Sequence, residues 1–188
     1  MTTSPPRLLV RAIRPDDRAA MLEFHAGLSP ETVYFRYFSP HPRLSEVDLG
    51  RFTCVDGTDR LAVVAFDGAR MVAVARVDRL PATNRAEVAV VVSDDFQDRG
   101  VGTALLERLV LDARAVGIEV LEADALASNH RMLAVFHHLG FPVRNTWEAG
   151  VAHVAFAIAP NDGYARAVAA RHRSFEFDQE IEAEGDPC

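Results

Sequence analysis

The sequence predicts a single α+β domain with seven strands and four main helices. Short runs rich in β-branched residues alternate with longer segments in which apolar residues recur at helical spacing. The chain has 188 residues, of which 49% are hydrophobic and 25% are charged, as is typical of a globular protein. No linker divides the chain, so we expect one domain over residues 1–160. A C-terminal tail over residues 161–188 is expected to be partly helical, then acidic and mobile.

The first third of the chain is expected to contain one strand and two helices. Residues 7–14 form a β-rich run, and the acidic turn at residues 15–17 marks the start of a helix. A second helix begins after Ser29, which can act as its N-cap, with Pro30 at the first helical position. This helix ends before Pro40, because the residue that precedes a proline disfavours helical geometry.

The rest of the chain alternates between strands and helices. The β-rich runs lie at residues 60–66, 70–77, 86–92, 118–126, 143–148 and 151–158. Asp67-Gly68, between the first two of these runs, indicates a hairpin. Apolar residues recur at helical spacing over residues 100–116 and 129–139, and Gly117 and Gly140 end these two helices.

Charge and composition exclude several classes of protein. The net charge is −7, and six acidic residues lie after Ser174, where no basic residue occurs. The rest of the chain is therefore nearly neutral and lacks the basic excess of a nucleic-acid-binding protein. We expect neither a secretory signal nor a membrane span, which needs about 20 consecutive apolar residues. The two cysteines, Cys54 and Cys188, are too few for a disulfide scaffold or a four-ligand zinc site. We expect a cytoplasmic protein without a metal.

The segment from residue 87 to residue 103 is the most informative one for function. A β-rich run is followed by a polar loop, by Gly100 and Gly102, and by an amphipathic helix. Glycines allow a ligand to approach the backbone, and a helix N-terminus offers free N–H groups, so this arrangement suits a phosphate group. The alternative is that the two glycines only permit a tight turn. A P-loop is excluded because the chain has no lysine, and Leu105 occupies the third glycine position of a dinucleotide fingerprint.

The loop resembles a known cofactor motif. Gln97-Asp98-Arg99-Gly100-Val101-Gly102 has the form Q/R-x-x-G-x-G/A and resembles the acetyl-CoA pyrophosphate motif of the GNAT superfamily of N-acetyltransferases. Residues 129–141 (NHRMLAVFHHLGF) resemble the second CoA-contacting helix of that family and the Gly-Phe that follows it. Together with residues 28–39 (LSPETVYFRYFS), they also resemble the acetyltransferase domain of bacterial protein lysine acetyltransferases. The similarity covers residues 7 to about 158.

This resemblance implies a fold, a cosubstrate and a set of contacts. The implied fold is a central mixed, mostly antiparallel sheet of six to seven strands, flanked by helices and splayed between the strands at 86–92 and 118–126. The implied cosubstrate is acetyl-CoA, with its pantetheine arm along the β-rich run at residues 86–92 and its pyrophosphate at the loop. The implied binding residues are Val90, Val91, Val92, Gln97, Asp98, Arg99, Gly100, Val101, Gly102, Thr103 and Asn129. For Asn129 a helix N-cap is the alternative interpretation, and both roles can hold.

Glu87 is the candidate general base, because the resemblance places the catalytic glutamate of lysine acetyltransferases at this position. Glu87 also leads an otherwise apolar run, and the five steps to Val92 span about 17 Å, comparable to an extended pantetheine arm. The alternative is a structural carboxylate paired with Arg85 or Arg76. Many members of the family carry a general-acid tyrosine on the last helix, where this chain has Phe136.

We therefore expect an acetyl-CoA-dependent N-acetyltransferase that transfers the acetyl group directly to an amine, with a protein lysine as the leading acceptor. One alternative keeps the enzyme and changes the acceptor to a small-molecule amine. Another is a non-catalytic acyl-CoA-binding regulatory module, which the missing tyrosine favours. Tyr34, Tyr37 and Phe38 are candidates to line the acceptor pocket, although an aromatic stripe at helical spacing is more often part of a core.

Overall fold

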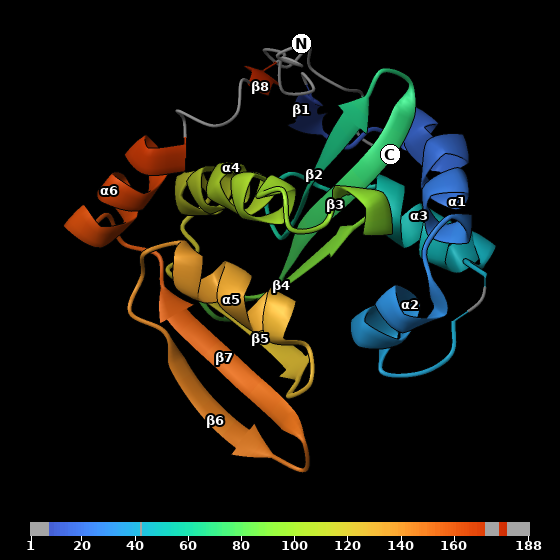
Figure 1. The fold of residues 1–188 in the computed structure, drawn as a ribbon. Helices are drawn as coiled ribbons and strands as arrows, with labels where there is room; N and C mark the ends of the chain where they lie inside the picture. The colour runs from blue at the N-terminus through green and yellow to red at the C-terminus, as the bar shows by residue number, and fades with distance from the viewer. Residues whose placement is uncertain (1–7, 42, 172–176, 180–188) are drawn as a thin grey trace, which may run out of the picture.

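The backbone forms one eight-stranded mixed sheet with helices on both faces (Figure 1). The computed structural model describes residues 8–41, 43–171 and 177–179. The strands are β1 (Leu8–Ala12), β2 (Arg60–Asp67), β3 (Arg70–Arg79), β4 (Arg85–Val92), β5 (Val120–Leu126), β6 (Arg144–Glu148), β7 (Val151–Ala157) and β8 (Phe177–Gln179). They lie in the order β6-β7-β5-β4-β3-β2-β1-β8. The pairs β4–β5 and β1–β8 are parallel, and the other neighbours are antiparallel.

All seven predicted strands are present, with ends that differ by at most two residues from the expected ones. The eighth strand is not among those that the sequence predicts. Residues 177–179 (β8) pair in parallel with β1 and form the edge of the sheet beside it. The mobility expected for the acidic tail concerns residues that, apart from these three, lie outside the described part of the chain. The helical part of the tail is α6 (Asp162–Arg171), which packs against the domain through the buried Tyr164.

The other helices are α1 (Arg18–Ala26), α2 (Pro30–Tyr37), α3 (Glu46–Thr53), α4 (Val101–Ala115) and α5 (His130–His138). Of these, α3 is not predicted by periodicity, because it is short, contains Gly50 and buries few apolar side chains. A signal is nevertheless available. Ser45 and Asp48 form a capping box, in which Asp48 N–H donates to Ser45 Oγ at 3.1 Å and Ser45 N–H donates to Asp48 Oδ2 at 2.8 Å.

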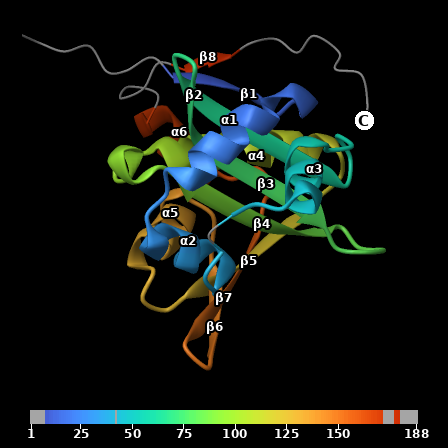
Figure 2. The same cartoon turned by 90° about the vertical axis from the view of Figure 1, so that its right-hand side faces the viewer.

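The sheet separates two apolar cores. On one face, α4 and α5 pack with fully buried side chains such as Leu105, Leu109 and Phe136. On the other face, α1 and α3 contribute Met21 and Leu49, and α2 lies beside them over β4 and β5 (Figure 2). Because side chains alternate along a strand, the two cores draw on alternate residues of the same strands.

The sheet is splayed between β4 and β5. These two strands pair only over Arg85–Glu87 and Val120–Glu122. Beyond that point β4 continues to pair with β3 as far as Val92, and β5 continues to pair with β7 as far as Leu126. The expected opening between the two strands is therefore confirmed, and it begins immediately after Glu87.

Candidate active site

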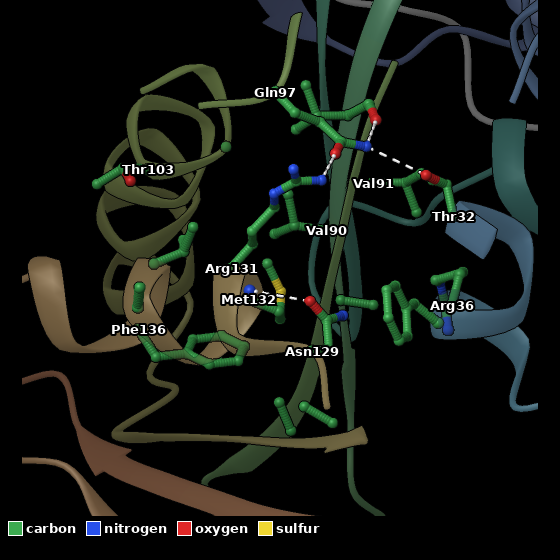
Figure 3. Close-up of a pocket in the computed structure, with 18 of the residues that line it drawn as sticks. Thr32, Arg36, Val90, Val91, Gln97, Thr103, Asn129, Arg131, Met132 and Phe136 are labelled. Atoms are coloured by element: carbon green, nitrogen blue, oxygen red, sulfur yellow. Dashed lines mark hydrogen bonds between the residues drawn. The ribbon is translucent and has the colours of Figure 1, made fainter. Parts of the chain in front are cut away.

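A cavity of about 740 Å³ occupies the opening between β4 and β5. It is bordered by α2 on one side and by the N-terminal end of α4 and the length of α5 on the other (Figure 3). The predicted site residues that line it are Glu87, Val90, Val91, Val92, Gln97, Asp98, Gly100, Val101, Gly102, Thr103 and Asn129. Sequence positions that lie up to about 40 residues apart thus meet around one volume, which is large enough for a ligand of cofactor size.

Gly100 and Gly102 shape the start of α4. Gly100 is the N-cap and has a φ of 79°, a left-handed conformation that favours glycine, and no side chain caps this helix. The first N–H groups of α4 therefore remain available to a ligand at the cavity. At Gly102 a Cβ atom would lie 3.3 Å from Val92 Cγ2 and 3.4 Å from Val90 Cγ1. The second glycine thus allows α4 to pack closely against β4.

Gln97 connects three parts of the cavity wall (Figure 3). Its Nε2 donates to the carbonyl oxygen of Val92 and to Thr32 Oγ1 of α2, both at 3.1 Å. Its Oε1 accepts a hydrogen bond from Arg131 Nη1 of α5 at 2.9 Å. The carboxylate of Asp94 extends this network, because it accepts hydrogen bonds from Thr32 Oγ1 at 2.8 Å and from Ser29 Oγ at 2.6 Å.

Asp94 is held as a carboxylate by these contacts. Burial raises the pKa of Asp94, but the hydrogen bonds from Ser29 and Thr32 outweigh it, and the resulting pKa lies below its usual value. The ionised side chain lies at the N-terminus of α2, where a negative charge is favourable. Asp94 therefore ties the start of α2 to the loop that precedes α4.

Asn129 performs the capping role that the sequence allows. Its Oδ1 accepts a hydrogen bond from Met132 N–H at 3.1 Å at the start of α5 (Figure 3). The same side chain lines the cavity, so a contact with a cofactor stays a compatible prediction. Arg99, by contrast, does not line the cavity. Its guanidinium lies over the ring of Phe96, 5.2 Å from the centroid.

Glu87 lies at the last position at which β4 pairs with β5, and it lines the cavity with an exposed side chain. The alternative interpretation is an ion pair with Arg76 or Arg85. Arg76 instead binds both oxygens of Asp78, at 2.9 and 3.0 Å. Arg85 binds Glu122 at 2.6 Å. Within the described residues, Glu87 forms neither an ion pair nor a side-chain hydrogen bond.

The α2 wall contains a residue that sequence reasoning misses. Arg36 is half-buried and lines the same cavity as Glu87. Burial lowers the pKa of Arg36 and Arg76 lowers it further, whereas Glu87 raises it. The aromatic stripe of α2 is only partly informative, because Phe35 lines the cavity while Tyr34 and Phe38 are exposed to solvent.

Tyr37 is also a candidate for the acceptor pocket, but it lies in a different cluster. Its ring stacks on His41 with a centroid distance of 4.3 Å, and His25 packs edge-on against both rings. Phe136, at the position of the missing tyrosine, lines the cavity and is fully buried. Among the described residues, no three His, Cys, Asp or Glu side chains form a group that could hold a metal ion. None of the described helices has the length and apolarity required to cross a membrane.

Comparison with known proteins agrees with this geometry. A sequence model of the acetyltransferase (GNAT) family matches residues 28–141. An acetyltransferase from Pseudomonas aeruginosa is 30% identical over 138 residues, which cover 71% of this chain and 74% of the relative. The acetyltransferase Pat from Mycolicibacterium smegmatis is 32% identical over 134 residues, covering 70% of this chain and 40% of Pat. The solved GNAT domain of S. lividans PAT is 38% identical, with a TM-score of 0.75 over 79% of this chain and 89% of that domain.

The chain belongs to the acetyltransferase (GNAT) family. It is an acetyltransferase that depends on acetyl-CoA, and its splayed mixed sheet is the fold that the sequence implies. The match to Pat spans less than half of that protein's length, so the activity of the whole of Pat does not transfer with it.

Proposed function

We propose that this protein transfers the acetyl group of acetyl-CoA directly to the side-chain amine of a protein lysine, with Glu87 as the general base. The observation that carries the proposal is the position of Glu87. It is a carboxylate without an ion-pair partner in the described structure, and it lies on the cavity wall where β4 and β5 separate. The N-terminus of α4, which no side chain caps, lines the same cavity.

The cofactor contacts in this proposal are those that the resemblance implies. The pyrophosphate binds at the start of α4, where Gly100, Val101, Gly102 and Thr103 line the cavity, and the pantetheine arm follows β4. Backbone groups of β4 that face β5 beyond Glu87 have no partner strand, and these groups can hydrogen-bond the amides of the arm. The acceptor approaches from the side of α2, where Glu87 and Arg36 share the wall.

The chemistry requires a base at this point. A lysine amine has a reference pKa of about 10.4, so attack by the neutral form at pH 7 carries a penalty of roughly 4.6 kcal/mol. Glu87 accepts the proton of the amine, directly or through a water molecule. The neutral nitrogen then attacks the thioester carbonyl, and an N–H group of the Val90–Val92 backbone stabilises the resulting oxyanion.

The attacking nitrogen is cationic in the tetrahedral intermediate and loses its extra proton to water. Collapse of the intermediate then breaks the C–S bond and releases the thiolate of CoA. Phe136, which is fully buried, has no hydroxyl group and therefore cannot donate a proton to the thiolate. A thiol has a reference pKa of about 8.5, so the thiolate is a competent leaving group near neutral pH without an acid. The absence of a hydroxyl at this position is therefore compatible with turnover.

The likeness to Pat and PAT supports a protein lysine as the acceptor. A cytoplasmic location, which the sequence leads us to expect, is part of the same proposal. In this proposal the transferase domain comprises residues 1–160, and the C-terminal tail packs against it through α6. Cofactor contacts at Gln97, Asp98, Arg99 and Asn129 also belong to this proposal. Asp98 and Arg99 would contribute only through their backbones, since the Asp98 carboxylate is paired with Arg131 and the Arg99 side chain lies over Phe96.

The test is release of CoA thiol from acetyl-CoA by the wild type, Glu87→Gln and Glu122→Gln, with a panel of proteins and small amines as acceptors. Glu122 is a matched control, because it lies beside Glu87 in the sheet register but is paired with Arg85. We expect Glu87→Gln to lower kcat about 10²-fold or more while CoA still binds. Glu122→Gln should retain kcat within a few-fold. Equal losses for both variants would refute the role of Glu87, and turnover with small amines alone would refute the protein acceptor.

A further inference from the structure

The cofactor end of the cavity has an unexpected distribution of charge. Acetyl-CoA carries several phosphate charges, yet the loop that would bind its pyrophosphate brings an aspartate, Asp98, to the cavity wall. The arginine of that loop, Arg99, lies over Phe96 and outside the cavity. Among the described residues, the guanidinium that lines this end belongs to Arg131, which comes from α5 rather than from the loop.

Arg131 spans the distance between α5 and the loop. Its Nε lies 3.2 Å from Asp98 Oδ2, and its Nη1 donates to Gln97 Oε1 at 2.9 Å (Figure 3). Both side chains of the ion pair are largely exposed, at 64% for Arg131 and 67% for Asp98. An exposed ion pair contributes at most about 1 kcal/mol, so these contacts can be exchanged for stronger ones.

The position of Arg131 within its helix points the same way. It is the second residue of α5, at the positive end of the helix dipole, and no acidic residue occupies the first turn. A cation at this position is unfavourable for the isolated helix. A bound phosphate group would reverse this, because it would neutralise both the guanidinium and the positive end of the helix.

We propose that Arg131 is a ligand of the phosphate groups of acetyl-CoA, and that it leaves Asp98 when the cofactor binds. This inference rests on the proposed binding of acetyl-CoA in this cavity. A guanidinium binds a phosphate through two parallel charge-assisted hydrogen bonds, which a single weak contact with an exposed carboxylate cannot match. Asp98 then acts as a competitor: its carboxylate pairs with Arg131, and cofactor binding must break this pair.

Equilibrium binding of CoA to purified protein tests this without any acceptor. We expect Arg131→Gln to weaken binding about 10-fold or more, and Arg131→Lys to recover only part of the loss. Asp98→Asn should bind CoA several-fold more tightly than the wild type, because it removes the competing carboxylate. Arg144→Gln, which removes an exposed arginine of β6 that does not line the cavity, is the charge-matched control.

The outcomes separate this inference from the proposed function. If the wild type binds CoA and Arg131→Gln binds it equally well, the role of Arg131 is refuted while the proposed function stands. A loss for Arg99→Gln as large as that for Arg131→Gln would also refute it. Failure of the wild type to bind CoA would refute both. Dephospho-CoA identifies the group: a loss restricted to CoA assigns Arg131 to the 3′-phosphate, and an equal loss for both ligands assigns it to the pyrophosphate.

Discussion

The contact between the end of α5 and the start of α6 offers a quantitative test of the structure. Gly140 has a φ of 86°, and a Cβ atom at this position would lie 2.5 Å from the carbonyl oxygen of Gly163. The contact is reciprocal, since a Cβ at Gly163 would lie 2.5 Å from the carbonyl oxygen of Gly140. Gly140→Ala therefore introduces two separate penalties, a left-handed backbone and a collision with the backbone of α6.

Two further variants separate these penalties. Gly150 also has a positive φ, 81°, but no atom lies within 4 Å of the position that a Cβ would take there, so Gly150→Ala introduces only the backbone strain. That strain is about 1–2 kcal/mol, partly offset by a loss of about 0.4–1 kcal/mol of freedom in the unfolded chain. Gly163→Ala introduces only the collision, for which overpacking gives about 1–3 kcal/mol. We therefore expect about 1 kcal/mol of destabilisation for Gly150→Ala and about 2–4 kcal/mol for Gly140→Ala.

Urea unfolding followed by circular dichroism measures these differences, and thermal melts provide a second reading. For a chain of this size, 1 kcal/mol shifts Tm by about 2–4 °C, so Gly140→Ala should melt roughly 5–15 °C below the wild type. If Gly140→Ala proves no more destabilising than Gly150→Ala, the close approach of α5 and α6 is refuted. If Gly163→Ala is neutral, the steric part of the reasoning fails even though the backbone part stands.

Two other predictions concern the α1–α2 side of the molecule. Burial lowers the pKa of His25 below 6.5, with His41 lowering it further and Asp48 opposing it, so the folded state binds fewer protons than the unfolded one. His25 therefore contributes stability above pH 6.5 that is lost as the pH falls, and Tm should fall between about pH 7.5 and about pH 5.5 in the wild type. His25→Gln should reduce this slope, and an unchanged slope would contradict the assignment. Asp94→Ala removes the carboxylate that accepts hydrogen bonds from Ser29 and Thr32, and it should lower the free energy of unfolding in urea by about 1–3 kcal/mol. The same variant should raise the KM of the amine substrate more than the Kd of CoA. An unfolding free energy equal to that of the wild type would rule out a structural role for this network.

The sequence is sufficient for those parts of the fold that rest on local pattern. Runs of β-branched residues locate the seven predicted strands. Gly100 locates the turn into α4, because a left-handed backbone favours glycine. The helix α3 escapes prediction since Gly50 interrupts its short apolar stripe, although the capping box at Ser45 is readable. The eighth strand depends on a pairing with distant β1, which no local pattern reveals.

The site divides in the same way. The start of α4 follows from the glycines of the loop, whereas the opening after Glu87 follows from what the resemblance to the GNAT family implies. Side-chain partners do not, because they depend on tertiary neighbours. Arg99 and Arg131 illustrate this point: the motif contains the first, but the fold turns it onto Phe96 and brings the second to the cavity from α5.

The alternation of side chains along β4 has a consequence for how acceptor preference can change. Val88 and Val90 belong to the core beneath α4, whereas Val91 belongs to the core beneath α1 and α3. Glu87 and Ala89 share the face of Val91. A combinatorial library confined to Ala89 and to the cavity-facing residues of α2 would therefore vary the acceptor wall and leave the packing between β4 and α4 intact.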